Sequence, residues 1–262
     1  MHTRAVLAPC YKKQIYDRWI STREERSALE GNVDSSILIS LVMPVFNTAP
    51  WLLDLAVQSV IDQTYENWEL CIVDDGSLRP STIECLAKYQ AADSRIRVTR
   101  SEQNLDISAA SNCALAMCKG DFVGLIDHDD ILAPHALTRV AGCLGANKNL
   151  KLVFSDEDRI TMSGERLEPY FKPGWNRLLL LEQNLVSHFG VYDRELLISI
   201  GGFREGLEGS QDWDLALRAA HKLRDSQIQH IPEVLYHWRI EPRSVSTSSV
   251  TQSRAVSAGI RA

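Results

Sequence analysis

Residues 121–130 read DFVGLIDHDD, a mostly apolar run that closes on three aspartates. Nearly continuous apolar runs of this length are typical of strands that are buried on both faces of a parallel sheet. Two other runs have the same form, WELCIVDD at 68–75 and LKLVFSDED at 150–158. If these strands are neighbours, their acidic ends meet at one edge of the sheet.

Helical patterns separate these runs. Further strands are predicted at 37–45 (ILISLVMPV) and 95–100 (RIRVTR). The predicted helices cover about 50–63, with Thr48 as N-cap and Pro50 in the first turn, 81–89 with Ser81 as N-cap, 108–118 before Gly120, and 134–144. Strands that alternate with helices in this way predict an α/β fold whose mainly parallel central sheet is covered by helices on both faces.

The two ends of the chain differ from the middle. Residues 1–36 combine apolar residues at near-helical spacing with a polar stretch that ends at Gly31, and they predict an N-terminal helical extension and linker. Residues 37–240 form the predicted single domain. Residues 241–262 are rich in Ser and Thr, which predicts a flexible tail or the start of a further segment.

Composition excludes several classes of protein. The 262 residues contain 28 Lys and Arg against 34 Asp and Glu, a net charge of −6 that argues against nucleic acid as a partner. Six cysteines without a Cys-x-x-Cys pair are typical of buried thiols in a reducing compartment. No apolar stretch approaches the roughly 20 residues of a membrane span. We therefore expect a cytoplasmic protein, with peripheral membrane contact left open.

The clustered carboxylates point to a divalent cation. Ligands of open parallel sheets bind beyond the carboxyl ends of the strands, and close negative charges repel unless a cation or protons neutralise them. Asp127 and Asp129 share one side of an extended segment, so both can reach one ion, and oxygen ligands favour Mg²⁺ or Mn²⁺. The alternatives are structural, with Asp130 capping the next helix and Asp74 forming a turn in DDGS.

A metal-bound diphosphate is the natural partner of such a site. The chain has no Gly-x-x-x-x-Gly-Lys-Ser/Thr loop, and its first strand is not followed by the glycine fingerprint of a Rossmann fold. A nucleotide whose diphosphate is neutralised by metal fits this pattern. Asp75, at the end of another strand, is placed to accept hydrogen bonds from the base or ribose.

These segments, in this order, resemble the family-2 glycosyltransferases of the GT-A fold. The resemblance rests on SLVMPVFN, QSVIDQTYENWELCIVDDGS, GDFVGLIDHDDILAPHAL, YFKPGWN, HFGVYDRELLISIGGFREG, EGSQDWDLALR and LYHWR, which together span about residues 38–240. The nearest members build bacterial O-antigen, capsule or similar surface polysaccharides. The resemblance implies a nucleoside-diphosphate sugar donor and a glycan or lipid-linked acceptor.

The resemblance also implies a role for individual residues. It places Asp75 on the nucleotide base, in a pocket lined by the backbone from Pro44 to Phe46, and Asp212 as the catalytic base of an inverting reaction. The other implied roles are an Asp-x-Asp element at Asp127 and Asp129 on ribose and metal, diphosphate or metal contacts at His237 and Arg239, and an acceptor side at His188. From the residues themselves, Asp156 and Glu157 either hold the acceptor or order a loop, and Trp213 could stack on a sugar ring on the acceptor side.

Several of these residues have structural alternatives. Asp212 precedes a helix and could simply cap it, although a helix N-terminus also favours its ionised form. Asp214, two residues on, should point elsewhere. His188, His237 and Trp213 could equally be packing residues. The sequence also departs from the family's pattern at Asp106, where relatives commonly have glycine, at Ser111 and at Gln211.

Other functions remain in competition with glycosyl transfer. A sugar-phosphate nucleotidyltransferase would need a basic, glycine-rich loop early in the chain, and VMPVFNTAPW has neither Lys nor Gly. A phospho-receiver or phosphatase would need a lysine on a later strand. A catalytically degenerate nucleotide-sugar-binding module would keep the fold without needing Asp212. Further domains and a homo-oligomer are left open.

Overall fold

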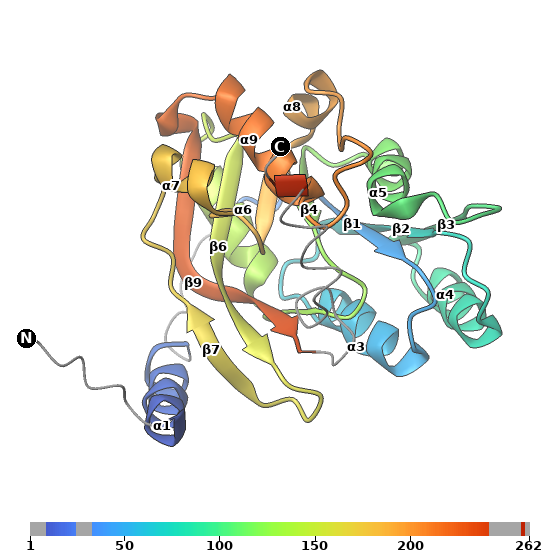
Figure 1. The fold of residues 1–262 in the computed structure, drawn as a ribbon, viewed down its shortest axis with the longest axis horizontal. Helices are drawn as coiled ribbons and strands as arrows, with labels where there is room; N and C mark the ends of the chain where they lie inside the picture. Colours follow the sequence, from blue (N-terminus) through green and yellow to red (C-terminus); the bar gives the residue numbers. More distant parts are fainter. Residues whose placement is uncertain (1–8, 25–32, 241–257, 260–262) are drawn as a thin grey trace, which may run out of the picture.

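The computed structural model of the protein describes residues 9–24, 33–240 and 258–259. Within these residues, nine strands form one mixed sheet that crosses the whole molecule (Figure 1). The strand order is β3-β2-β1-β4-β8-β6-β9-β5, with β7 paired to β6. The strands are β1 (Ile39–Val45), β2 (Trp68–Asp74), β3 (Ile96–Arg100), β4 (Phe122–Leu125), β5 (Ile131–Leu132), β6 (Leu152–Ile160), β7 (Arg166–Tyr170), β8 (Gly190–Asp193) and β9 (Ile228–Arg239).

Strand directions bring the acidic segments to one edge. Strands β3, β2, β1 and β4 are parallel, and β8 is antiparallel to both β4 and β6. Strand β6 therefore runs in the same direction as β4, and β9 is parallel to β6. The carboxyl ends of β2, β4 and β6 lie along the same edge of the sheet, and the prediction of a mainly parallel sheet is confirmed.

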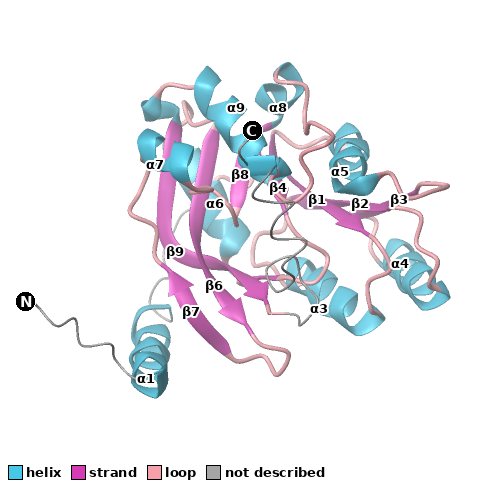
Figure 2. Cartoon of the chain, in the orientation of Figure 1, coloured by secondary structure: helices cyan, strands magenta, loops and turns pink. Residues whose placement is uncertain are grey.

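Helices cover both faces of the sheet (Figure 2). One face packs against α3 (Pro50–Ile61), α4 (Pro80–Ala92) and α6 (Ala136–Ala146). The other face packs against α5 (Asp106–Met117), α7 (Arg177–Glu182), α8 (Arg194–Ser199) and α9 (Gln211–Lys222), and a 3-10 turn at Asp225–Gln227 leads into β9. The sheet thus separates two hydrophobic cores, as its apolar strands predict.

Strand β1 shows why the sheet needs cover on both sides. All seven of its residues are buried, although successive side chains point to opposite faces. Leu41 and Met43 pack in the core under α3, α4 and α6, whereas Val42 between them packs in the core under α5 and α9. A strand with one solvated face would have alternated with polar residues.

The two predicted N-caps differ from the structure. Ala49 is the N-cap of α3 and provides no side-chain cap, while the buried hydroxyl of Thr48 has no hydrogen-bond partner among the described residues. Helix α4 begins at Pro80, so Ser81 lies inside its first turn. In both helices proline occupies the first position, where its fixed φ starts the helix and its missing N–H costs nothing.

The strand predicted across 121–130 ends at Leu125, and residues 128–129 form a turn. The chain turns here because the carboxylate of Asp130 is buried and needs partners. It accepts hydrogen bonds from the hydroxyl of Tyr236 and the backbone N–H of Arg239 on β9. Asp130 therefore leads into β5 and does not cap α6, which begins at Ala136.

The N-terminal helix α1 (Pro9–Trp19), followed by one π-helical turn (Ile20–Glu24), lies beside β7. The rings of Tyr16 and Trp19 contact Phe171, and the Tyr16 hydroxyl donates a 2.6 Å hydrogen bond to Asp158. A helix in the predicted extension is therefore present. Residues 25–32 and most of 241–262 lie outside the described residues, so the predicted linker and tail stay predictions.

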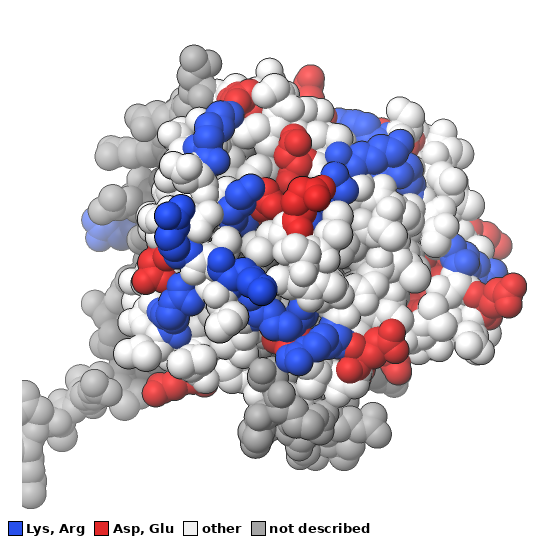
Figure 3. Space-filling view, turned by 90° about the horizontal axis from the view of Figure 1, so that it is seen from above, with Lys and Arg blue, Asp and Glu red and all other residues white. Residues whose placement is uncertain are grey.

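Figure 3 looks onto the side of the molecule that carries α7, α8 and α9, where Lys and Arg lie among acidic side chains. Several of them form ion pairs, such as Arg177 with Asp225 and Arg194 with Glu195. Among the described cysteines, Cys71, Cys85 and Cys118 are buried free thiols, as predicted, whereas Cys113 is exposed. Across the described segments, no helix combines the length and hydropathy that crossing a bilayer requires.

Candidate active site

Three side chains converge at the carboxyl edge of the sheet, beyond β4. Asp127 and Asp130 follow that strand, and His188 precedes β8. Each offers one ligand atom, and these atoms all lie within 4.8 Å of one another. Asp130 and His188 thus join Asp127 in the group, which the Asp-x-Asp spacing did not predict.

Tyr236 on β9 holds this group together. Its buried hydroxyl donates to Oδ2 of Asp130 at 2.7 Å and accepts from the backbone N–H of Asp127 at 3.1 Å. The imidazole of His188 stacks on its ring with 4.5 Å between centroids. One tyrosine therefore contacts all three members, which fixes their positions relative to one another.

The electrostatics of the group suit a hard divalent cation. Burial raises the pKa of Asp127, and the nearby charges of Asp129 and Asp212 raise it further, against an opposing effect of His188. Burial and the neighbouring aspartates also raise the pKa of Asp130 well above its usual value. A bound cation would relieve both costs. Two carboxylates and one imidazole are ligands that Mn²⁺ or Mg²⁺ accepts.

Asp129 and His237 lie outside the three-residue group. Asp129 occupies the turn, with Oδ1 3.6 Å from Nδ1 of His128. His237 neighbours Tyr236 on a strand, so its side chain points to the opposite face. There its Nδ1 lies 2.6 Å from Oδ1 of Asp158, and both residues are buried.

Arg239 stabilises the turn that carries the aspartates through hydrogen bonds. Its Nε donates to the carbonyl oxygen of Asp129 at 2.7 Å, and Nη1 donates to that of Thr161 at 3.2 Å. The third nitrogen, Nη2, is buried and has no hydrogen-bond partner among the described residues. Burial lowers the pKa of this guanidinium. A buried N–H without a partner beside an acidic group can serve an anionic ligand.

Asp212 lies in the first turn of α9, close to the cluster of Asp127, Asp130 and His188, which we call the acidic group. Its charge acts on both Asp127 and the buried Lys172. Asn184 donates a 2.6 Å hydrogen bond to its Oδ2. Asp214 points away, as predicted, and is fully buried in ion pairs with Arg204 and Arg218. The two aspartates of this helix therefore have separate surroundings.

Asp75 lies further along the same edge, after β2. Its Oδ1 accepts a 2.8 Å hydrogen bond from the backbone N–H of Leu105, and burial raises its pKa. Pro44 is buried in β1, whereas the ring of Phe46 just after it is 44% exposed. Gly76, at φ +71°, lies so close to the backbone of Gln103 that a Cβ would collide with it at 2.6 Å.

The remaining acceptor-side candidates have structural partners. Oδ1 of Asp156 accepts from the backbone N–H of Lys172 and lies 2.6 Å from Nε2 of His230. Glu157 forms a 3.1 Å ion pair with the buried ammonium of Lys172 and accepts from the backbone N–H of His188. The indole N–H of Trp213 donates to the carbonyl of Leu180 and ties α9 to α7.

Sequence reasoning missed Tyr236, Asn184 and Lys172. Tyr236 stands in the quoted LYHWR segment, but only the register of β9 against β5 and β6 shows which of its residues faces the aspartates. Asn184 and Lys172 lie in stretches without a periodic pattern. For Lys172, the available signal was its position among aromatic residues in YFKPGW, because a lysine that is buried there needs a partner.

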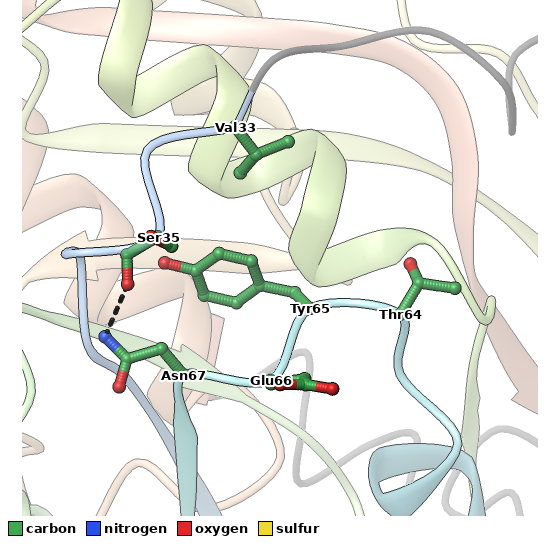
Figure 4. Close-up of a pocket in the computed structure, with 6 residues that line it drawn as sticks. All are labelled: Val33, Ser35, Thr64, Tyr65, Glu66 and Asn67. Carbon is green, nitrogen blue, oxygen red and sulfur yellow. Dashed lines mark hydrogen bonds between the residues drawn. The ribbon is translucent and has the colours of Figure 1, made fainter.

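An open pocket lies at the opposite ends of the strands, where β1 and β2 begin. It has a volume of about 480 Å³ and is lined by Val33, Ser35, Thr64, Tyr65, Glu66 and Asn67, which precede β1 and β2 (Figure 4). The side-chain amide of Asn67 donates to the carbonyl of Ser35 across it. The pocket lies far from the acidic group, because the parallel strands separate the two edges.

The chain is similar to segments of longer bacterial proteins. It is 37% identical over 252 residues to the O-antigen biosynthesis protein RfbC of Myxococcus xanthus, covering 94% of this chain and 20% of that protein. It is 43% identical over 246 residues to the uncharacterized protein y4gI of Sinorhizobium fredii, covering 91% of this chain and 27% of that one. The chain thus spans about a quarter or less of the length of these relatives.

The fold has a counterpart among solved structures. The crystal structure of S. aureus TarS residues 1–349 in complex with UDP superposes with a TM-score of 0.65 at 20% sequence identity, over 79% of this chain and 61% of that one. The predicted GT-A architecture is thereby confirmed. The model of the family described as glycosyl transferase family 2 matches residues 40–201, which include the whole acidic group. The chain belongs to glycosyl transferase family 2.

Proposed function

We propose that this chain is a metal-dependent, inverting glycosyltransferase domain that moves a hexosyl or deoxyhexosyl group from a nucleoside-diphosphate sugar to a hydroxyl group of a glycan or lipid-linked acceptor. The observation that carries the proposal is the convergence of Asp127, Asp130 and His188 within reach of the charge of Asp212. Membership of family 2 supports glycosyl transfer, and the relative named for O-antigen biosynthesis supports a surface polysaccharide as product.

The donor would lie along the carboxyl edge of the sheet. Asp75 would bond the base, with Pro44 and Phe46 beside it, and Asp127 and Asp129 would face the ribose and diphosphate. A divalent ion held by Asp127, Asp130 and His188, in the place first assigned to Asp129 and His237, would neutralise the charge of the leaving nucleoside diphosphate. The unpartnered Nη2 of Arg239 supports a contact to the same anion. A UDP complex of the structural neighbour makes UDP-sugars the first donors to test.

Asp212 would act as the general base. Its carboxylate accepts the proton of the acceptor hydroxyl while that oxygen bonds to the anomeric carbon, and the bond to the diphosphate oxygen breaks with its electron pair leaving on the nucleotide. One attack from the face opposite the leaving group inverts the configuration. A positioned carboxylate of this kind contributes about 10²- to 10⁴-fold in rate.

The same proposal assigns the parts of the chain. Residues 37–240 would be the catalytic domain, residues 1–36 an extension that docks α1 on β7, and residues 241–262 a tail or the start of a further segment. The enzyme would work in the cytoplasm or at the cytoplasmic face of a membrane. Asp156, Glu157, His188 and Trp213 would lie on the acceptor side, partly by ordering the loops around it.

A thermal-shift panel of UDP-, GDP- and dTDP-sugars, with and without Mn²⁺, tests donor binding. A ligand of the native state raises the melting temperature by mass action, so one nucleotide class should stabilise the chain and only with the metal present. Asp212→Asn should keep that shift and lose turnover by 10²-fold or more, while the exposed control Asp62→Asn keeps both. Turnover that survives Asp212→Asn would instead support a base elsewhere, and binding without any turnover would support the degenerate module.

A further inference from the structure

A second concave surface lies next to the acidic group, between β6, β7 and β9. It has a volume of about 250 Å³ and is lined by Glu157, Asp158, Arg159, Glu168, Tyr170 and Trp238. We call it the β6–β7 groove. Two contacts join it to the acidic group, because Glu157 accepts a 3.0 Å hydrogen bond from the backbone N–H of His188, and the Trp238 ring lies 6.1 Å from the His188 imidazole between centroids.

The lining of the groove combines aromatic faces with charged groups. Trp238 is half-buried, and the guanidinium of Arg159 lies over its ring at 5.0 Å from the centroid. Tyr170 is held by a 2.5 Å hydrogen bond from the side chain of Gln183 to its hydroxyl. Sugars present apolar C–H faces that pack on aromatic rings and hydroxyls that bond to charged groups. This lining therefore suits a carbohydrate.

The charges of the groove select among carbohydrates. Glu157, Glu168 and Arg159 present their charged groups to it, whereas the fully buried carboxylate of Asp158 lies with His237 on the opposite face of the strands. Asp158 is bound by His237 and Arg166, and Glu157 by Lys172, so their positions are fixed. Arg159 is paired with Glu168 at 2.8 Å. Each of these carboxylates already has a cationic partner, so no lining cation is left over to pair with an anionic sugar.

We propose that the β6–β7 groove is the subsite for the acceptor and that it takes one neutral sugar residue, stacked on Trp238 with its free hydroxyl directed toward the acidic group. This inference rests on the proposed function and deepens it, because it names the class of acceptor. The volume lies below the roughly 300–1,000 Å³ of drug-sized sites and fits a single ring. A uronic acid is disfavoured, because its carboxylate would lose water there without gaining a cation as partner.

The test uses the full chain with Mn²⁺ and UDP present. Binding of methyl glycosides of glucose, galactose, mannose and rhamnose is compared with that of the methyl glycosides of glucuronic and galacturonic acid by saturation-transfer NMR titration. At least one neutral glycoside should bind 5-fold or more tightly than either uronide. Equal or tighter binding of a uronide, or no binding of any neutral glycoside, would overturn the proposal.

Substitutions separate the groove from the donor site. Trp238→Ala should weaken the neutral glycoside 10-fold or more and leave UDP affinity within 2-fold, and Trp238→Phe should restore part of the loss. Glycoside binding that is unchanged in Trp238→Ala would refute the subsite. Failure of the unmodified chain to bind UDP, GDP and dTDP alike would instead refute the proposed function, so the two failures are distinct.

A variant that gains binding gives a further test, because misfolding cannot produce a gain. Glu168 is exposed, and Glu168→Lys changes the formal charge of the lining by two units. This variant should bind glucuronide more tightly than the unmodified chain by 3-fold or more. The matched control is Glu84→Lys, which makes the same change at an exposed position of α4, the helix that contacts the outermost strand β3. An equal gain in both variants would show a general charge effect and overturn the assignment.

Discussion

The side-chain amide of Asn184 donates a 2.6 Å hydrogen bond to Oδ2 of Asp212. The carbonyl oxygen of the same amide accepts from the backbone N–H of Ser187, next to His188. Asn184 therefore connects the candidate base at the start of α9 with the loop that carries a candidate metal ligand. The two halves of the proposed site are coupled through one side chain.

Asn184→Ala should lower the rate of transfer without changing donor affinity. A hydrogen bond to a charged group contributes about 1.5–3 kcal/mol, so a loss of about 10- to 100-fold in kcat is expected if the bond orients Asp212 for attack. Steady-state kinetics at saturating acceptor measure it, with KM for the donor as the internal control. A rise in donor KM at constant kcat would assign Asn184 to ground-state binding.

Asp130 should matter more than Asp129 for metal affinity. Asp130 lies within the three-residue group, whereas Asp129 occupies the turn outside it. In the presence of UDP, Asp130→Asn should weaken Mn²⁺ binding by at least 10-fold and Asp129→Asn by less than 3-fold, as measured by titration calorimetry. Circular dichroism controls for folding, because Asp130 also accepts two buried hydrogen bonds. The reverse order would return the metal to the Asp-x-Asp pair.

The sheet and its acidic edge were predictable because both depend on local patterns. Near-continuous apolar runs such as residues 39–45 cannot be stable with one face in water, and parallel strands necessarily align their carboxyl ends. The location of Asp127 and Asp212 at this edge was predictable for the same reason. Asp127 follows a strand and Asp212 lies at the start of a helix, and both features can be recognised in the sequence.

Contacts between distant segments were not predictable in the same way. The partners of Asp130 lie more than a hundred residues away on β9, and a change of one residue in register would have presented His237 instead of Tyr236. The predicted N-caps of α3 and α4 were wrong for a local reason. Pro50 and Pro80 begin these helices, and the side chains of Thr48 and Ser81 do not cap them. Both kinds of error concern a choice between neighbouring residues.

Asp106 occupies a backbone conformation that suits glycine. Its φ is +68°, in the left-handed region. That conformation costs L-residues roughly 1–2 kcal/mol, and Asp is among the side chains that tolerate it best. Asp106→Gly should therefore be more stable than Asp106→Ala by about 1 kcal/mol in urea unfolding. Both variants remove the same charge, so their difference isolates the backbone, and equal stabilities would contradict this explanation.

Asp214 should make stability depend on pH in the acid range. Burial alone would raise its pKa, but hydrogen bonds from Arg204 and Arg218 lower it below the usual value. Because the pKa of the folded state lies below the roughly 3.9 of an unfolded aspartate, the stabilisation is complete above about pH 4 and is lost as the pH falls further.

Asp214→Asn removes the buried carboxylate that Arg204 and Arg218 bind. Because Arg204 is half exposed, the loss should be limited to about 1.5–3 kcal/mol at pH 7. The difference from the unmodified chain should shrink when urea unfolding is measured at pH 3, since the carboxylate of the unmodified chain is then being protonated. Asp225→Asn, which breaks the exposed pair with Arg177, should leave the stability at pH 7 nearly unchanged, because solvent screens that pair. A difference for Asp214→Asn that stays constant from pH 7 to pH 3 would mean that packing of the side chain, and not its charge, fixes the start of α9 and with it the position of Asp212.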